Sequence, residues 1–211
     1  MSSEWFNDEV AMTEQVTEAE YRSRLMDGMA AAVAEKGYAE TTIADIVRLA
    51  RVSKRTFYQH FASKEECLLA LYTAATDQLI EVIRRAIEGA HDMHSRVRCA
   101  HRAYLQRIKE HPLLMRTLFI EILAAGSRGL QVRRAANQRF ADLLRATGAD
   151  QQYDSPQKRH ITPALAMAIV GGINELILQA MESNQIERLL EIEEPATALL
   201  EAVLARPIAD D

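Results

Sequence analysis

Residues 41–72 read TTIADIVRLARVSKRTFYQHFASKEECLLALY, and this stretch decides the fold. Thr42 and Ser53 each precede a short segment with apolar residues at helical spacing, and both are preferred N-cap residues. Phe57 and Phe61 are four residues apart, so they share one face of the second segment. Two short helices joined by a tight turn and packed on a longer helix form a helix-turn-helix. The stretch therefore predicts a unit that can place a helix in the major groove of DNA.

Further signals predict helices on both sides of this stretch. Thr17 lies three residues before Glu20, which is the spacing of a capping box, and Gly37 suits a left-handed helix end. Ser63 and Glu66 repeat the capping-box spacing ahead of another apolar run. We therefore expect a helix that begins at Thr17 and a long helix that begins after Ser63.

The distribution of charge is uneven along the chain. The formal net charge of −5, taken alone, argues against binding to nucleic acid. The first twenty residues carry six acids and no base, whereas residues 48–64 carry five bases and no acid. A basic patch on an acidic protein is the electrostatic footprint expected of a DNA-binding surface, and a solvated charged face is the alternative.

Several classes of protein lack support in the sequence. No basic segment followed by an apolar run opens the chain, and no 18 consecutive residues are both apolar and uncharged, so we expect neither a signal peptide nor a membrane span. Cys67 and Cys99 form no short-spaced pair, which fits reduced thiols in the cytoplasm. The sequence has no GxSxG, HExxH, P-loop or GxGxxG motif, so we expect no enzyme and no cofactor.

Residues 41–72 resemble the DNA-binding region of the tetracycline-repressor (TetR) family. The shared pattern is a Thr pair, an Ile-Ala-like helix, a Val-Ser turn, a Thr-aromatic-Tyr-x-His-Phe helix and a Ser-Lys-Glu cap. The GGINELI stretch over residues 171–177 adds a weaker likeness. Arg51 and Arg55 stand where the family often has Gly, so Arg51 would take a positive φ at some cost in strain. The resemblance implies a cytoplasmic regulator, most simply a repressor, that binds a palindromic double-stranded operator as a homodimer and leaves it when a small hydrophobic effector binds.

The resemblance and the helix pattern together predict an all-α fold with two working parts. An N-terminal three-helix helix-turn-helix DNA-binding domain is followed by a larger helical ligand-binding and dimerisation domain. The predicted boundaries are an acidic tail over residues 1–16, the DNA-binding domain over 17–64 and the effector-binding and dimerisation domain over 65–211. The alternative function is a small helical carrier or enzyme that uses the C-terminal cavity directly.

The predicted DNA contacts divide into two kinds. Base-edge contacts set sequence choice, and phosphate contacts set affinity and register. We assign Lys54, Arg55 and Gln59 to bases, because they lie on the outward face of the second short helix. We assign to phosphates the residues at helix starts and flanks, namely Thr42, Tyr58, His60 and Lys64. Half-buried packing is the alternative for Tyr58 and His60. Ser53 and Thr56 complete the predicted DNA-binding set.

The predicted effector site and dimer contact lie in the C-terminal part of the chain. The effector candidates are aromatic, methionine and polar side chains on otherwise apolar helices, namely Tyr104, Met115, Phe119, Asn174 and Glu175. Core packing is the alternative role for these residues. The very apolar segment over residues 164–181 carries Gly171 and Gly172, so a partner helix could approach it closely. We expect dimerisation through this helix and the last one.

A group of metal-binding residue types falls within eleven positions, namely His91, His94, Cys99 and His101. Imidazole and thiolate are ligands for zinc or copper, but this spacing is also that of surface histidines near a loop. We predict no metal site, and the role of the group stays open at this point.

Overall fold

The computed structural model describes residues 5–149, 161–183 and 185–205, and these residues are helical with short connections. The all-α prediction is confirmed. The elements, in chain order, are α1 (Trp5–Glu40), α2 (Ile43–Ala50), α3 (Lys54–His60), α4 (Lys64–Ile87), α5 (Met93–Glu110), α6 (Pro112–Phe119), the 3₁₀ helix η1 (Glu121–Ala125), α7 (Gly126–Ala149), α8 (Pro163–Glu182), the 3₁₀ helix η2 (Ile186–Ile192) and α9 (Glu193–Ala205).

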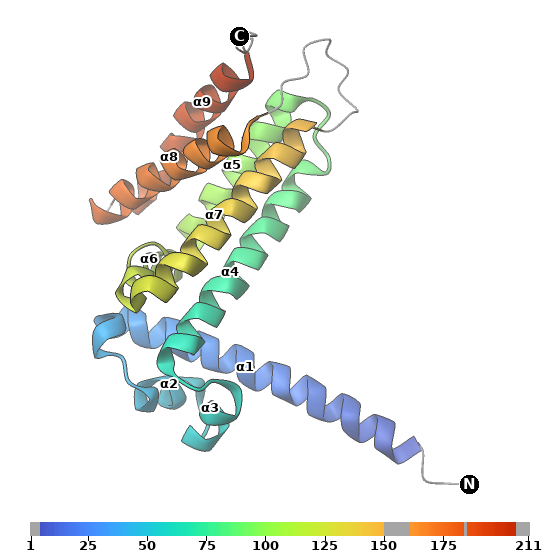
Figure 1. Ribbon diagram of the computed structural model, residues 1–211, viewed down its shortest axis with the longest axis vertical. Coiled ribbons are helices and arrows are strands. Elements are labelled where there is room, and N and C mark those ends of the chain that lie inside the picture. The colour runs from blue at the N-terminus through green and yellow to red at the C-terminus, as the bar shows by residue number, and fades with distance from the viewer. Residues whose placement is uncertain (1–4, 150–160, 184, 206–211) are drawn as a thin grey trace.

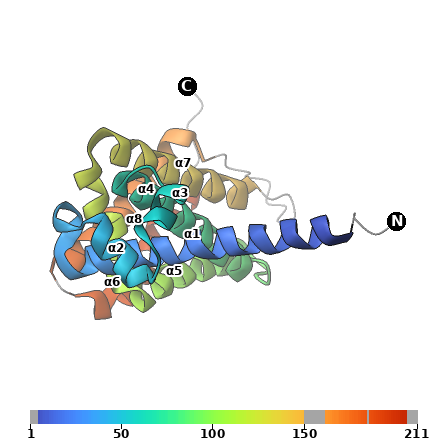
Figure 2. The ribbon, with the colours of Figure 1, turned by 90° about the horizontal axis from the view of Figure 1, so that it is seen from below.

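The molecule has a small helical unit at one end, made of α1, α2, α3 and the start of α4 (Figure 1). A longer helix bundle, made of the rest of α4 and the elements from α5 to α9, lies above it. Helices α2 and α3 lie beside α1 in the small unit, and the view from below shows α1 crossing the whole of that end (Figure 2). Helix α4 belongs to both units, because it leaves α1 and then packs along α5 and α7. Helices α8 and α9 lie on the far side of the bundle from α4 (Figure 1).

Side-chain caps fix the start of the short helices. The Thr42 side chain accepts from the Asp45 amide, and the Asp45 carboxylate accepts from the Thr42 amide, so a complete capping box begins α2. The Ser53 and Ser63 side chains accept from the amides of Thr56 and Glu66 and so cap α3 and α4. The predicted second box differs in one respect, because the Glu66 carboxylate accepts from the amide of Ala62 at 2.7 Å.

Helix α1 differs from the prediction at its start and agrees with it near its end. It begins at Trp5, so the start predicted at Thr17 is wrong. The Thr-x-x-Glu spacing is compatible with the middle of a helix, and spacing alone cannot tell the two apart. Gly37 interrupts the helix with a φ of 80°, a value that costs little only for glycine.

The core of the small unit depends on close approach of α1 and α2. A Cβ atom on Gly28 would lie 2.6 Å from the Ile46 carbonyl oxygen, so no larger residue fits there without moving the backbone. Leu25, Met29 and Phe57 are fully buried around this contact. Their burial supplies most of the driving force for a unit with so few residues.

Helix α8 is the most apolar helix that the structure describes. By length and composition alone it could cross a membrane, with a mean hydropathy of 1.6. Within the fold its Ile169, Ile173 and Ile177 are buried, and the helix packs against α7. The opposite face of α8 is exposed and largely apolar.

Candidate nucleic-acid interface and effector cavities

Helix α3 presents the predicted base-reading side chains to solvent. Lys54, Arg55 and Gln59 are exposed, and 53% of the surface of Tyr58 is exposed to solvent. Phe57 is fully buried on the opposite side of the helix, where it contacts the ring of Phe61 at 5.9 Å between centroids. The burial of one face therefore determines which side chains the helix can offer to DNA.

The turn before α3 is held by the backbone and by a residue that sequence reasoning missed. Arg51 adopts the left-handed conformation, with φ 55° and ψ 45°, as the positive-φ prediction required. Arg24, from α1, donates to the carbonyl oxygens of Ala50 and Arg51 at 3.1 and 2.9 Å. These bonds satisfy carbonyls at the end of α2, so a strained turn is kept in one shape.

Ion pairs engage only some of the basic residues in and near the helix-turn-helix. Lys36 pairs with Asp45, and Arg48 lies 3.5 Å from Glu35. The Lys36 ammonium, with the Thr42 hydroxyl, holds the pKa of Asp45 below its usual value. Within the described part of the chain, Lys54 and Arg55 have no carboxylate partner, so their charge is available to a phosphate or a base edge.

The remaining predicted contact residues are divided between exposed and internally bonded groups. Thr42 is exposed but its hydroxyl bonds to Asp45, and the hydroxyls of Ser53 and Thr56 lie 2.8 Å from each other. His60 is half-buried, with its ring 6.4 Å from that of Tyr21. All of these side chains lie on or beside the exposed surface formed by α2 and α3, which we call the α2–α3 surface.

Lys64, for which the sequence predicted a phosphate contact, makes hydrogen bonds within the protein. Its ammonium donates to the carbonyl oxygens of Tyr38, Ala39 and Thr41 at 3.0, 3.1 and 2.8 Å, and it lies 4.7 Å from the centre of the Tyr38 ring. Three N–H groups thus meet three acceptors. The physical reason is that α1 ends here with unsatisfied carbonyls, which attract a cation.

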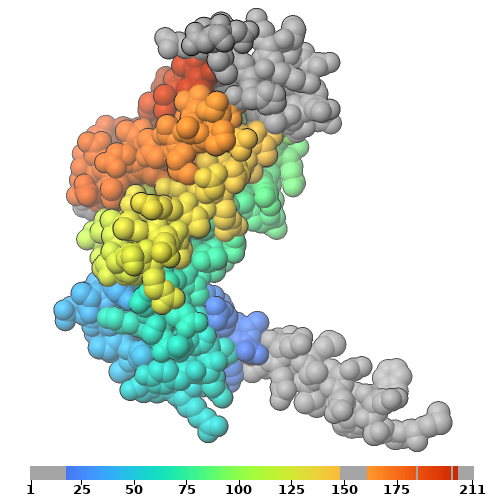
Figure 3. All heavy atoms as spheres, in the orientation of Figure 1, coloured from blue at the N-terminus to red at the C-terminus, as the bar shows by residue number. Residues whose placement is uncertain are grey.

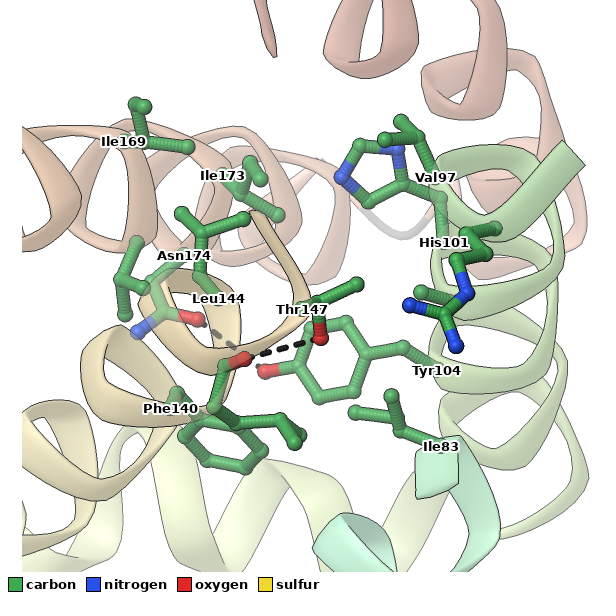
Figure 4. A pocket seen from close by; sticks show the side chains of 14 residues that line it. Ile83, Val97, His101, Tyr104, Phe140, Leu144, Thr147, Ile169, Ile173 and Asn174 are labelled. Carbon is green, nitrogen blue, oxygen red and sulfur yellow. Dashed lines mark hydrogen bonds between the residues drawn. The ribbon is translucent and has the colours of Figure 1, made fainter. Parts of the chain in front are cut away.

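A large apolar cavity opens in the upper bundle, between α5, α7 and α8 (Figure 4). Its volume is about 100 Å³, and it opens to solvent at one side. Its apolar walls include Val97, Ala100, Leu143, Leu144, Ile169 and Ile173. We call this space the large cavity. Such a lining suits the apolar body of a small molecule.

A second, more polar cavity of about 20 Å³, which is room for about one water molecule, lies nearer the small unit. It is lined in part by Tyr72, Phe119, Arg133, Asn137 and Asn174, and we call it the polar cavity. Tyr104, Phe140 and Asn174 line both cavities.

A chain of hydrogen bonds separates the two cavities. The Tyr104 hydroxyl donates to Asn174 Oδ1 at 3.0 Å (Figure 4), and Asn174 Nδ2 donates to Asn137 Oδ1 at 3.1 Å. Burial raises the pKa of Tyr104, so its hydroxyl stays protonated and can donate.

The predicted effector residues therefore separate into three groups. Tyr104 and Asn174 line both cavities, and Phe119 lines the polar cavity. Met115 is buried in the core and lines neither cavity. Glu175 is exposed, because it follows Asn174 by one residue and so turns to the other side of α8. Met115 and Glu175, which the sequence assigned to the effector site, therefore line neither of these two cavities.

The histidine group forms no metal centre within the described residues, where no three potential ligands come together. Buried His101 places its Nδ1 atom 3.1 Å from the Thr197 hydroxyl oxygen on α9. Burial lowers the pKa of His101, and the nearby Glu193 carboxylate partly opposes this shift. His101 thus links α5 to α9 and also borders the large cavity.

One carboxylate connects the bundle to the small unit. Glu121, at the start of η1, accepts a hydrogen bond from the Tyr38 amide at 2.9 Å and lies against Gly37. Arg128 on α7 pairs with Glu65 on α4 nearby. Figure 3 shows α6, η1 and the start of α7 seated directly on the small unit. Bundle rearrangements can therefore reach the end of α1 through this contact.

Comparison with known proteins agrees with this geometry. Residues 25–71 match the family described as bacterial regulatory proteins, tetR family. The HTH-type transcriptional regulator UidR of Escherichia coli K12 is 24% identical over 202 residues, which span 92% of this chain and 98% of UidR.

Solved structures share the fold across most of the chain. The fatty acid degradation regulator FadR from Bacillus halodurans superposes with a TM-score of 0.75 at 18% identity, covering 88% of this chain and 95% of that one. FadR from Bacillus subtilis, solved in complex with stearoyl-CoA, gives a TM-score of 0.72 at 17% identity, covering 84% and 96%. At such identities the likeness concerns the fold alone.

Proposed function

Because this chain is a DNA-binding transcription regulator that belongs to the TetR family, we propose that it is a dimeric repressor released from its operator by a small, mainly apolar effector. The observation that carries the proposal is the exposed face of α3. There Lys54, Arg55 and Gln59 project into solvent from a helix whose other face is buried. Such a helix fits the major groove with its N-terminal residues against base edges.

Arg55 is the residue assigned to sequence choice. A guanidinium can bond two acceptors of one guanine, and such a pair contributes about 1–3 kcal/mol of discrimination. The Arg55→Ala variant should therefore lose affinity for the operator while its affinity for scrambled DNA changes little. Operator fragments from the upstream region of the gene, titrated at several salt concentrations, provide the measurement.

Arg84→Ala is the matched control, because Arg84 is an exposed cation on α4, beyond the α2–α3 surface. It makes the same change in net charge and should leave both affinities unaltered. If Arg55→Ala weakens operator and scrambled DNA equally, Arg55 is a phosphate contact. If the wild-type protein does not bind its upstream DNA but does bind small apolar molecules, the alternative role as a carrier is favoured.

The exposed face of α8 and α9 is the proposed dimer contact. Leu165, Leu176 and Leu199 are exposed there, and added Cβ atoms at Gly171 and Gly172 would meet no atom within 4 Å. A second copy packing its own α8 and α9 on this face would bury the leucines in a two-fold contact. The two α3 helices would then lie one DNA turn apart, about 34–36 Å.

Sedimentation tests the dimer directly. Leu176→Arg should yield a monomer at micromolar concentration, because it places a charge at the centre of an apolar contact. Leu113→Arg changes an exposed leucine on α6, outside the proposed face, and should leave the dimer intact. A normal dimer from Leu176→Arg would contradict the proposed face.

Release follows from a shift between two separations of the recognition helices. The effector would occupy the large cavity and favour the separation that does not match the operator. Glu121 provides a route for this shift, since it joins η1 to the end of α1. FadR from Bacillus subtilis, which shares this fold, was solved with stearoyl-CoA, a molecule with one long apolar chain.

A further inference from the structure

The polar cavity has one cation and several hydrogen-bond donors on its wall. Asn174 Oδ1 accepts from Tyr104, and Asn137 Oδ1 accepts from Asn174. The wall also carries the Asn137 amide N–H₂, the Tyr72 hydroxyl and the Arg133 guanidinium. A carboxylate pairs with a guanidinium more strongly than an alcohol or amide does.

Arg133 is the unusual member of this wall. It is half-buried on α7, and it has neither an ion pair nor a hydrogen bond with any residue in the described ranges. Its charge lies close enough to Tyr72 to oppose the burial that raises the pKa of that phenol to about 12. A guanidinium partly removed from water is costly unless an anion is paired with it.

The two cavities are neighbours that share Tyr104, Phe140 and Asn174, so a ligand that breaks the Tyr104–Asn174 hydrogen bond can span both. Along α7 the lining extends from Arg133 to Thr147, which is about 21 Å at 1.5 Å per residue. The polar end lies toward Phe119 at the end of α6, and the apolar end lies toward Thr147 near the end of α7. A ligand that spans both cavities has one polar end and one apolar end.

The geometry points to an effector that carries a carboxylate at one end of an apolar body. The carboxylate binds the Arg133 guanidinium with help from Tyr72 and Asn137, and the apolar body extends past Phe140 into the large cavity. This inference rests on the proposed function, since it identifies the chemical class of the effector. It also places the charged end of the ligand beside Phe119, which lines the polar cavity at the end of α6.

Matched pairs of probes test the charge alone. Hexanoate with hexanol, dodecanoate with dodecanol, and phenylbutyrate with phenylbutanol differ within each pair only in the end group. Titration calorimetry on the full-length protein should show that at least one acid binds about 10- to 100-fold more tightly than its alcohol. Arg133→Met should abolish that preference while the alcohol still binds, and Arg133→Lys should restore part of it.

Arg134→Met is the control, because Arg134 is the neighbouring arginine on α7, is exposed and lines neither cavity. This variant should keep the preference for the acid. Equal binding of acid and alcohol by the wild type, binding of no probe, or an unchanged preference in Arg133→Met would each overturn the inference. DNA binding measured on the same samples separates this failure from failure of the proposed function, because a protein that binds its operator yet shows no acid preference loses only the carboxylate.

Discussion

The small unit and the bundle build their sites in opposite ways. In the small unit, short helices with capped starts turn their apolar faces inward and their chemistry outward, as Phe57 and Arg55 illustrate on α3. In the bundle, long helices direct Tyr104, Arg133 and Asn174 inward, toward cavities that no single helix defines. The outward site is specified by local sequence, whereas the inward site exists only after distant helices have packed.

The sharpest way to break this comparison is to make the same truncation in both units. Phe57→Ala should reduce the free energy of unfolding of the small unit by about 3–5 kcal/mol, because the ring is fully buried and leaves a void. Phe140→Ala should cost less, because that ring is partly buried and already borders both cavities. Chemical denaturation, followed for each variant beside the wild type, gives both values.

DNA binding extends the same test. Phe57→Ala should abolish operator binding, since α3 loses its anchor, whereas Phe140→Ala should retain it and alter binding of apolar probes instead. Equal destabilisation by the two substitutions would mean that the bundle packs as tightly around Phe140 as the small unit does around Phe57. The contrast drawn above would then be incorrect.

A second comparison concerns two lysines at the starts of neighbouring helices. Lys64→Met should lower the stability of the protein by roughly 1.5–3 kcal/mol, because three carbonyl oxygens lose a charged donor. Lys54→Met should leave stability unchanged and weaken operator binding, because Lys54 is exposed and has no carboxylate partner among the described residues. Thermal unfolding and DNA titration on both variants separate the two roles. Unchanged stability for Lys64→Met, together with a salt slope of DNA binding reduced by about one, would restore the phosphate contact that the sequence suggested.

The smallest expected effect is a pH dependence confined to the bundle. Burial lowers the pKa of His101 from its ordinary value of 6.5. The unfolded chain therefore takes up this proton first, so stability is complete above about pH 6.5 and falls as the pH drops from 6.5 towards the folded-state pKa. His101→Gln should remove this part of the dependence, and the difference between the two unfolding profiles at pH 5.5 and 7.5 measures it. A profile that does not change with the substitution would show that His101 is not buried as a neutral ring.

How far sequence reasoning reached follows from the same contrast. The starts of α2, α3 and α4, the positive φ of Arg51 and the exposure of Lys54, Arg55 and Gln59 could all be predicted, because caps, turns and helix faces are local properties. The start of α1 could not, since a capping-box spacing inside a helix looks the same as one at its end.

Tertiary contacts account for the other features that sequence reasoning could not supply. Lys64 has the residue type and position of a phosphate contact, and only the approach of the end of α1 reveals the carbonyls that engage it. Glu175 and Asn174 are neighbours in sequence, yet only the packing of α8 determines which one faces the cavities. Arg133 could not be singled out from the sequence, because only the folded structure shows that no carboxylate among the described residues pairs with it.

The bond from the Tyr38 amide to Glu121 has a consequence that runs in both directions. If effector binding weakens the hold on the operator through this contact, thermodynamic reciprocity requires the operator to weaken effector binding by the same factor. A regulator seated on DNA would then respond at a higher effector concentration than the same molecule free in the cell. Removing the carboxylate with Glu121→Gln would bring these two thresholds closer together, so one hydrogen bond would help to set the concentration at which the regulated gene is switched.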